Sequence, residues 1–502
     1  MFLISFQVID FSFLAVYRIN TDHRKIIGLL MIYPRKSFFK YVFNRIIQGY
    51  FKELKRSAYS PSIRFITSIV CIQKMSSKLF SIMDRFRTIL SIRVLSMFSS
   101  DPKHEIVRHR PDTIYINQLM EKAHIPGLSI QVVSGEQTLY SYQSGYATLD
   151  SQGKGNIPIT RDSIFNWCSI TKTVCAMAVM QQVEIGLVDL DTDINKYIVP
   201  NHFSPICNRY HPKDAITLRH LLTHTASIGS TGVLNYFQVP QDDFTGISLE
   251  DFLENYLRTN GKYYVEENWL NCSIGSKYSY SNVGIGLAAW IIELVTKTNY
   301  MTYTKERIFQ PLGLHDVSWT IKDYTEEQQK SIVHPYMFNV KVDQIQPYLP
   351  QIPITQLSNK WIALELNSIQ PYPAGQLRST IESLSVLLSV FINNGTYKGI
   401  QILHPKSVQE ISTVQYPDLA NGSIGLVYTY FKSLGFPFDK NYLGHNGSLS
   451  GYATWMLFDP ETNIGVCLLS NGDLGNTNQH QRELVDRTLI SIVNYLFQVF
   501  EQ

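Results

Sequence analysis

The sequence predicts a mixed α/β protein of the α+β type, in which an antiparallel sheet is flanked by helices. Three observations support this expectation. One pair of alternating strands stands near the start of the globular part, a second pair stands near the end of the chain, and apolar segments with helical spacing lie between them. We therefore expect the two hairpins to meet in one sheet whose edges come from both ends of the globular part.

The first elements follow the order helix, strand, strand, helix. Residues 112–124 are typical of a helix that ends before a Pro-Gly pair. Residues 128–133 alternate as a strand, and after a Ser-Gly turn residues 138–142 return as its hairpin partner. Residues 169–186 then predict a strongly apolar helix closed by a glycine.

The later elements are helices separated by a less regular stretch. Further helices are expected over 217–224 and 284–297. The stretch from about 320 to 370 is rich in Pro and Gln, and it predicts loops. The chain closes with strands over 451–458 and 464–470 and with a helix from about 480 to 500.

Charge divides the chain into a basic arm, residues 1–105, and a mildly acidic body, residues 106–502. The first 100 residues carry 16 Lys and Arg against 4 Asp and Glu, a net charge of +12, and the remainder carries 28 against 37, a net charge of −9. A hydrophobic content of 44% allows a large core and excludes a disordered or collagen-like chain. The acidic body gives no reason to expect nucleic-acid binding.

The basic arm is expected to be poorly ordered or to act as a targeting segment. Residues 75–100 are rich in Ser and Arg, hold Asp84 as their single acid, and place apolar residues at helical spacing. This composition is typical of a mitochondrial presequence, and a cytoplasmic protein is the alternative. No apolar run is long enough to span a bilayer, although the arm could contact a membrane surface weakly.

The cysteines and histidines predict no metal site, and no cofactor is expected. Six cysteines lie far apart without a CxxC pair, so reduced and mostly buried thiols are expected. His220 and His224 lie four residues apart on a short helix, a spacing that could bind zinc. The HExxH motif is absent and no third ligand is evident, which argues against a metal.

Ser169 and Lys172 form the first candidate for chemistry, a Ser-x-x-Lys motif. Three residues apart on a helix, the side chains share one face, so the lysine can take the serine proton or stabilise the alkoxide. The motif occurs three more times, at Ser37, Ser100 and Ser151. Only Ser169 opens a strongly apolar helix, where the helix dipole favours a nucleophile, although a serine there could also be a simple N-cap.

Tyr280 and Asn282 form a second candidate, a Tyr-x-Asn motif just before the helix at 284–297. A phenol held near a serine and a cation can act as a general base, and an asparagine can orient a substrate amide. Tyr-x-Asn also occurs at Tyr115, so a loop tyrosine followed by a capping asparagine is the alternative.

His445, Asn446, Gly447 and Ser448 form the third candidate, expected just before a strand. A glycine carries no side chain, so it lets a substrate lie against a strand edge. A backbone N–H beyond Gly447 could complete an oxyanion hole with the N–H of Ser169.

The order Ser-x-x-Lys, Tyr-x-Asn, His-x-Gly, at intervals of 111 and 165 residues, resembles that of the penicillin-recognising serine hydrolases, in particular their class C β-lactamase-like branch. The resemblance covers about residues 112–500 and includes the strings ITLRHLLTHTASI, YSNVGIGLAAWIIELVTKTNY, PAGQLRST and GHNGSLSGYATWMLFDPETNIGVCLLSN. It implies an antiparallel sheet flanked by helices, an inserted mainly helical subdomain, and a site between the two.

The resemblance also assigns roles to the motif residues. Ser169 would be the acylated nucleophile, Lys172 its activating partner, Tyr280 the general base or proton shuttle, Asn282 a substrate amide contact, and His445 the Lys-or-His of the third motif. One departure affects the substrate: His-Asn-Gly stands where class C β-lactamases usually have Lys-Thr-Gly. A neutral histidine attracts a β-lactam carboxylate less than a lysine does. Thr225-Ala226-Ser227 stands in place of the family's Thr-Ser-Gly, which affects only the local loop.

We consider three functions for a chain with these motifs. The leading one is a serine hydrolase, an esterase or peptidase, that cleaves a small-molecule or peptide substrate through an acyl-enzyme on Ser169. Hydrolysis of β-lactams is a second function within the same chemistry. The third is a catalytically quiet scaffold or filament-forming protein, against which the intact motifs argue. The fold does not specify the substrate or the oligomeric state.

Overall fold

The computed structural model describes residues 3–9, 12–21, 24–32, 110–229, 237–432, 440–474 and 477–501. The chain divides into two compact units, Met1–Val107 and Arg108–Gln502. The first unit contains an antiparallel sheet of β1 (Leu3–Ile9), β2 (Ser12–Thr21) and β3 (Arg24–Ile32). The presequence-like segment 75–100 lies outside the described residues. Within the residues given above, no helix is both long and apolar enough to cross a membrane.

The second unit is built on a seven-stranded antiparallel sheet with the order β16-β17-β18-β19-β4-β5-β6. Its strands are β4 (Gly127–Ser134), β5 (Gln137–Leu149), β6 (Gly155–Pro158), β16 (Thr429–Lys432), β17 (Asn441–Leu449), β18 (Tyr452–Phe458) and β19 (Ile464–Ser470). The edge strands β6 and β16 come from the two ends of the unit, as expected, and β4 pairs with β19 in the middle. The predicted α+β class is confirmed.

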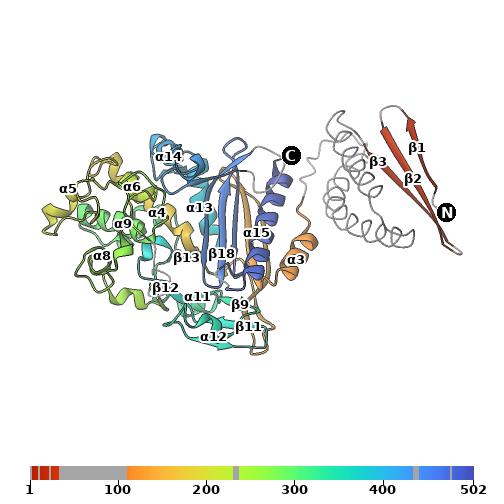
Figure 1. The fold of residues 1–502 in the computed structure, drawn as a ribbon, viewed down its shortest axis with the longest axis horizontal. Helices are drawn as coiled ribbons and strands as arrows, with labels where there is room; N and C mark the ends of the chain where they lie inside the picture. Colours follow the sequence, from red (N-terminus) through yellow and green to blue (C-terminus); the bar gives the residue numbers. More distant parts are fainter. Residues whose placement is uncertain are drawn as a thin grey trace, which may run out of the picture. The chain divides into compact units, whose positions relative to one another are not determined.

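Helices cover both faces of this sheet (Figure 1). One face carries α3 (Thr113–Lys122) and α15 (Gln479–Phe500), and the other carries α13 (Ile381–Ile392). Side chains alternate along a strand, so Leu468 of β19 packs with α15 while Leu469 packs with α13. Both faces are buried, so every residue of β19 is buried and all except Ser470 are apolar.

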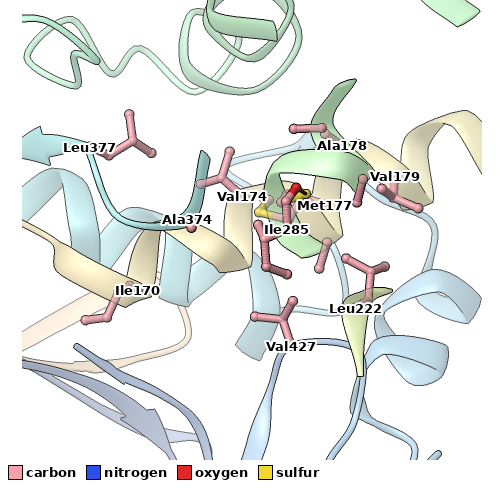
Figure 2. Close-up of a cluster of buried hydrophobic side chains, with 14 of the residues drawn as sticks. Ile170, Val174, Met177, Ala178, Val179, Leu222, Ile285, Ala374, Leu377 and Val427 are labelled. Carbon is pink, nitrogen blue, oxygen red and sulfur yellow. Dashed lines mark hydrogen bonds between the residues drawn. The ribbon is translucent and has the colours of Figure 1, made fainter. Parts of the chain in front are cut away.

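A mainly helical region lies beside the sheet. Its helices are α5 (Asn195–Ile198), α6 (Leu218–Leu222), α8 (Leu249–Leu257), α9 (Asn282–Thr296) and α10 (Tyr300–Thr304). Helix α4 (Lys172–Glu184) packs against α9, and Figure 2 shows the apolar cluster around it, with Val174 and Met177 near Ile285 of α9. Every residue from Lys172 to Met180 is buried, so the start of α4 is held on all sides.

Short elements join the two regions. β7 (Phe165–Asn166) pairs with β13 (Arg378–Ser379), and β8 (Gln238–Pro240) pairs with β12 (Asn367–Ile369). The small hairpin β14 (Thr396–Tyr397) and β15 (Ile400–Gln401) precedes α14 (Pro405–Ser412). The β7–β13 pair brings the segment before Ser169 against the string PAGQLRST.

The stretch from 320 to 370 is not a set of loops, so that expectation was wrong. It contains α11 (Glu326–Lys330), β9 (Tyr336–Phe338), α12 (Val342–Ile345), β10 (Ile354–Gln356) and β11 (Trp361–Leu364). The three strands form a small antiparallel sheet with its own apolar core, which includes Met337, Ile345 and Ile362. Strands of three or four residues are too short to show a period in the sequence.

The ends of two site elements also differ from the expectation. The third motif lies inside β17, not before a strand, because pairing with β18 extends the strand through Gly444 and Gly447. The helix expected from Ser169 begins as a 3-10 turn, Cys168–Thr171, and becomes α-helical at Lys172. The helices expected over 112–124, 217–224, 284–297 and 480–500 are confirmed as α3, α6, α9 and α15.

Candidate functional site

Ser169 lies in the tight turn that leads into α4. Cys168 adopts a left-handed φ of 52°, and its N–H is held by the Asn166 side-chain oxygen at 2.6 Å. Ser169 follows this bend, and it is the one residue from 163 to 180 that is partly exposed, since all the others are buried. A bent turn fixed by a buried core is a suitable base for a nucleophile, since it holds the hydroxyl in one place.

Lys172 points at the Ser169 hydroxyl. Its Nζ lies 2.9 Å from Ser169 Oγ and 2.5 Å from the backbone oxygen of Ala374. The side chain has no exposed surface, and this burial holds the pKa of Lys172 well below its usual value; the neighbouring Cys168 and Cys175 oppose the shift. A neutral amine at this distance can accept the serine proton.

Tyr280 lies over Lys172, just before α9. The Lys172 Nζ is 4.8 Å from the centre of the Tyr280 ring. Burial raises the pKa of Tyr280, and a hydrogen bond with Ser169 opposes that shift. Ser281 caps α9 by accepting the Gly284 N–H at 3.1 Å, so the position of Tyr280 is tied to the helix start. The phenol is therefore held in its protonated form beside the nucleophile.

Strand β17 forms the opposite wall of the site. A side-chain carbon placed on Gly447 would come within 2.7 Å of Cys168 Cβ and 2.8 Å of the Ser169 nitrogen. Only a residue without a side chain lets the strand approach the nucleophile turn this closely. The third motif therefore meets the first through backbone contact at Gly447.

His445 lies on the same face of β17 as Gly447. It is 6% exposed, and its ring centre is 6.4 Å from that of Tyr280. Its Nδ1 contacts the Asn446 carbonyl oxygen. Burial, with the nearby Lys172, lowers the pKa of His445 to about 3, so its imidazole is neutral at physiological pH.

Three other predicted substrate-binding residues are Asn282, Asn446 and Ser448. Asn446 and Ser448 alternate with Gly447 and pair with Trp455 and Ala453, which face α15, so these two side chains belong to the opposite face of β17. The side chains of Asn446 and Ser448 therefore lie on the face of β17 away from that of Gly447. Asn282 is the first residue of α9, and its buried Oδ1 has no hydrogen-bond partner in the described part of the chain.

The other occurrences of Ser-x-x-Lys and Tyr-x-Asn lie in a surface turn, at a hydrogen-bonded asparagine, or outside the described residues. Ser151 lies in an exposed turn, whose backbone is held by Asp150. Asn117, two residues after Tyr115, accepts a hydrogen bond from Tyr142 at 2.8 Å. Ser37 and Ser100 lie outside the described residues. Of the five described cysteines, all free, Cys168, Cys175 and Cys467 are buried, as expected for most of them.

Sequence reasoning missed two groups in the site. The backbone oxygen of Ala374, in the string PAGQLRST, holds Lys172. His224, set aside with His220 as a weak zinc pair, lies against Tyr280 with ring centres 4.4 Å apart. Both belong to quoted strings, but only the tertiary structure brings them to the nucleophile. Among the residues described, no group of three or more His, Cys, Asp or Glu side chains could hold a metal ion.

The sheet, the helical region and the Ser169–Lys172–Tyr280 group define the β-lactamase/transpeptidase-like fold. Residues 115–489 match the family model described as Beta-lactamase, so the chain belongs to the beta-lactamase family. The resemblance inferred from the three motifs is thereby confirmed at the level of family and fold.

Individual relatives are distant. Protein flp of Staphylococcus aureus (strain N315) is 23% identical over 377 residues, which cover 75% of this chain and 65% of that protein. D-amino acid amidase of Ochrobactrum anthropi SV3 superposes with a TM-score of 0.56 at 22% identity, covering 76% of this chain and 99% of that one. D-alanine carboxypeptidase AmpC of Burkholderia cenocepacia superposes with a TM-score of 0.51 at 20% identity, covering 76% and 97%. These structural likenesses establish the fold alone, and this chain spans about two thirds of the first relative's length.

Proposed function

We propose that this chain is a serine hydrolase that cleaves an ester or amide bond, peptide bonds included, through an acyl-enzyme on Ser169. The observation that carries the proposal is the 2.9 Å hydrogen bond between Lys172 Nζ and Ser169 Oγ, made by a lysine with no exposed surface. Burial favours the neutral amine, and a neutral amine can act as a base where an ammonium cannot.

In the proposed acylation, Ser169 Oγ bonds to the substrate carbonyl carbon while its proton moves to Lys172 Nζ. The carbonyl oxygen takes the electron pair and is stabilised by the N–H of Ser169 and a β17 N–H beyond Gly447. The bond to the leaving group then breaks, and the leaving group takes the proton by way of Lys172 and Tyr280. Water attacks the acyl-enzyme, gives a proton back to Ser169 by the same route, and releases the acid.

We assign the base to Lys172 and the shuttle to Tyr280. Burial lowers the pKa of the lysine and raises that of the tyrosine, so both are neutral at rest. A neutral amine can accept a proton at once, whereas a neutral phenol must pass one on. The Lys172 Nζ lies 4.8 Å from the centre of the Tyr280 ring, so a substrate atom between them could bond to both groups.

The edge of β17 would hold the substrate backbone. Strand β16 pairs with β17 only from Asn441 to Gly444 in the described part of the chain, so residues 445–449 have a strand partner on the β18 side alone. An extended peptide or an acyl chain with an amide could add to this edge as a further strand. This arrangement supports an amide or peptide substrate, like those in the names of the amidase and carboxypeptidase of the same fold.

Carboxylate-bearing substrates should be held weakly at the third motif. His445 is buried and neutral at physiological pH, so it offers no fixed positive charge where class C enzymes have a lysine. We therefore propose that the enzyme hydrolyses neutral esters and amides better than β-lactams.

Labelling with a fluorophosphonate probe tests the nucleophile. The wild-type protein should be labelled, and Ser169→Ala should abolish labelling and turnover with little change in Tm, because removal of such a nucleophile typically costs several orders of magnitude in rate. Ser151→Ala is the matched control, because it alters the Ser-x-x-Lys motif of the exposed turn. This variant should be labelled as the wild-type protein is. An unlabelled wild-type protein would favour the quiet scaffold.

A substrate panel tests the specificity. Short-chain p-nitrophenyl esters, D-amino-acid amides and peptides, and nitrocefin would be compared by kcat/KM. We expect esters or amides to exceed nitrocefin. Hydrolysis of nitrocefin near the diffusional ceiling of roughly 10⁸ M⁻¹s⁻¹ would instead identify a β-lactamase.

A further inference from the structure

His224 follows α6 in an unusual backbone conformation. Its φ is 58°, in the left-handed region that disfavours residues with a side chain, and it is 3% exposed. The N–H of Thr225 bonds to the His220 oxygen at 2.8 Å, which closes the bend. The bend directs the imidazole toward the segment that carries Tyr280.

Three contacts of this one residue surround Tyr280. The backbone oxygen of His224 accepts the N–H of Ser279 at 2.7 Å, and its Nδ1 accepts the N–H of Ser281 at 3.2 Å. Its ring lies 4.4 Å from the Tyr280 ring, centre to centre, at an angle of 40°. The residues immediately before and after Tyr280 and the phenol ring itself are thus all fixed by His224.

The hydrogen bonds also define the state of the imidazole. Because Nδ1 accepts the Ser281 N–H, the proton of the neutral ring is on Nε2. Burial lowers the pKa of His224 well below its usual value, and the nearby Lys172 and His445 lower it further, so the ring stays neutral. Protonation of Nδ1 would remove the acceptor that holds Ser281.

The Nε2 atom is buried and has no hydrogen-bond partner among the described residues. Buried polar atoms in a purely structural position are nearly all satisfied, and an unpaired N–H is costly. The contacts of His224 with Tyr280 and its neighbours are made by the backbone oxygen, Nδ1 and the ring, and Nε2 takes no part in them.

We propose that His224 is a positioning residue that holds Tyr280 at the nucleophile through the hydrogen bond from Ser281 to Nδ1. The inference rests on the proposed function, because it concerns the proton shuttle of that reaction. A displacement of about 1 Å in a group that takes part in catalysis can cost 10²-fold in rate. Loss of the Nδ1 acceptor should therefore lower kcat while the affinity for substrate changes little.

Two substitutions separate this role from packing. His224→Leu removes both the acceptor and the ring. His224→Asn restores an acceptor oxygen near the Nδ1 position, and asparagine tolerates a positive φ better than most residues. His220 offers a matched control, since its Nδ1 accepts the Thr217 N–H at 3.2 Å in the capping box of α6. His220→Leu and His220→Asn make the same chemical changes one helical turn away.

The readouts are kcat and KM on an ester that the wild-type enzyme hydrolyses, and the rate of fluorophosphonate labelling. We expect His224→Leu to lose about 100-fold in kcat and labelling rate with KM within about threefold, and His224→Asn to recover to within about tenfold of wild type. Both His220 variants should keep wild-type kcat, although their Tm can fall.

The inference is overturned if His224→Leu is folded and has wild-type kcat, or if His224→Asn is as slow as the folded leucine variant. If His224→Leu does not fold, His224→Gln, whose longer amide places no acceptor at the Nδ1 position, takes its place with the same expected loss. A wild-type protein that the probe does not label would contradict the proposed function itself, whereas labelled wild type with unchanged variants would contradict only the role of His224.

Discussion

At the scale of single residues, the site depends on groups whose ordinary charge is suppressed by burial. Lys172, His445 and His224 all have lowered pKa values because they lie out of water, close to one another. Three cationic side chains could not share this volume if they were charged, since their mutual repulsion in a poorly solvated site would be large. In their neutral forms, Lys172 can act as a base, His445 lines the wall of the site, and His224 offers a fixed hydrogen-bond acceptor.

Lys172→Met should stabilise the fold while abolishing turnover. Unfolded Lys172 titrates near 10.5 and folded Lys172 well below that value, so between the two pKa values folding releases a proton and wild-type stability rises with pH. Methionine has no such proton. We expect the free energy of unfolding to rise, because methionine avoids a cost of about 1.4 kcal/mol for each pKa unit by which burial lowers the pKa of Lys172.

The gain should be larger at pH 6 than at pH 9, because the wild-type protein recovers stability as the pH rises. Thermal unfolding of both proteins at several pH values measures it, with Ser169→Ala as the inactive control that keeps the lysine. A difference in Tm that does not shrink as the pH rises would show that the lysine amine carries no desolvation cost.

Gly447→Ala should damage both the fold and the reaction. Its Cβ would stand 2.4 Å from Thr454 Oγ1 and 2.8 Å from the Ser169 nitrogen, so β17 must move away from the nucleophile turn. We expect a loss of about 1–3 kcal/mol in stability from overpacking. If the reaction proceeds as proposed, the rate should fall about 10²-fold or more, because the N–H of β17 moves away from the proposed oxyanion position.

Gly246→Ala is the control for this change, since no atom lies within 4 Å of an added carbon there. Denaturant unfolding and kcat of the two variants would be compared with wild type. Equal activity of Gly447→Ala and Gly246→Ala would mean that close approach of β17 is not needed for the reaction.

At the scale of elements, α13 illustrates how a loop residue fixes a helix against the sheet. Asp316 accepts hydrogen bonds from the N–H of Thr380 at 3.0 Å and from its hydroxyl at 2.7 Å, at the N-cap of α13. A carboxylate in this place also interacts favourably with the helix dipole. The contact joins the segment after α10 to the helix that covers one face of the sheet.

Asp316→Ala should therefore lower the free energy of unfolding by about 1–3 kcal/mol, because the Thr380 groups lose their acceptor. The exposed Asp162 provides a matched control, and Asp162→Ala should stay within about 0.5 kcal/mol of wild type. Urea unfolding measures both. Coincident unfolding curves for the two variants would rule out a capping role for Asp316.

At the scale of the whole molecule, every residue of the three motifs lies in the unit Arg108–Gln502. A protein that begins at Asp101 should therefore keep its Tm and its kcat within error of the full chain, because it retains the core, the sheet and the site. Comparison of kcat and Tm for the two proteins checks this. A soluble, active full chain beside an insoluble or inactive truncated one would show that residues 1–100 contribute to the folded core.

The sequence by itself determined the hairpins, the long helices and the three motifs. Alternation and helical spacing are local, so the order strand pair, helices, strand pair could be read directly. The motif order also led to the family, although each motif alone was weak. The predictions that failed concern the three small strands between 336 and 364 and the strand through His445. These strands form because they pair with other strands, and no local sequence pattern indicates such pairing.

Only the tertiary structure decided which groups act together. Sequence spacing brings Ser169 and Lys172 onto one turn, but Tyr280, Gly447 and His224 reach it from three other elements. Burial, a property of the whole packed molecule, then decides the charge of each group. Hence Lys172 could be named from the sequence, whereas its neutrality and the role proposed for His224 follow only from the groups that surround them.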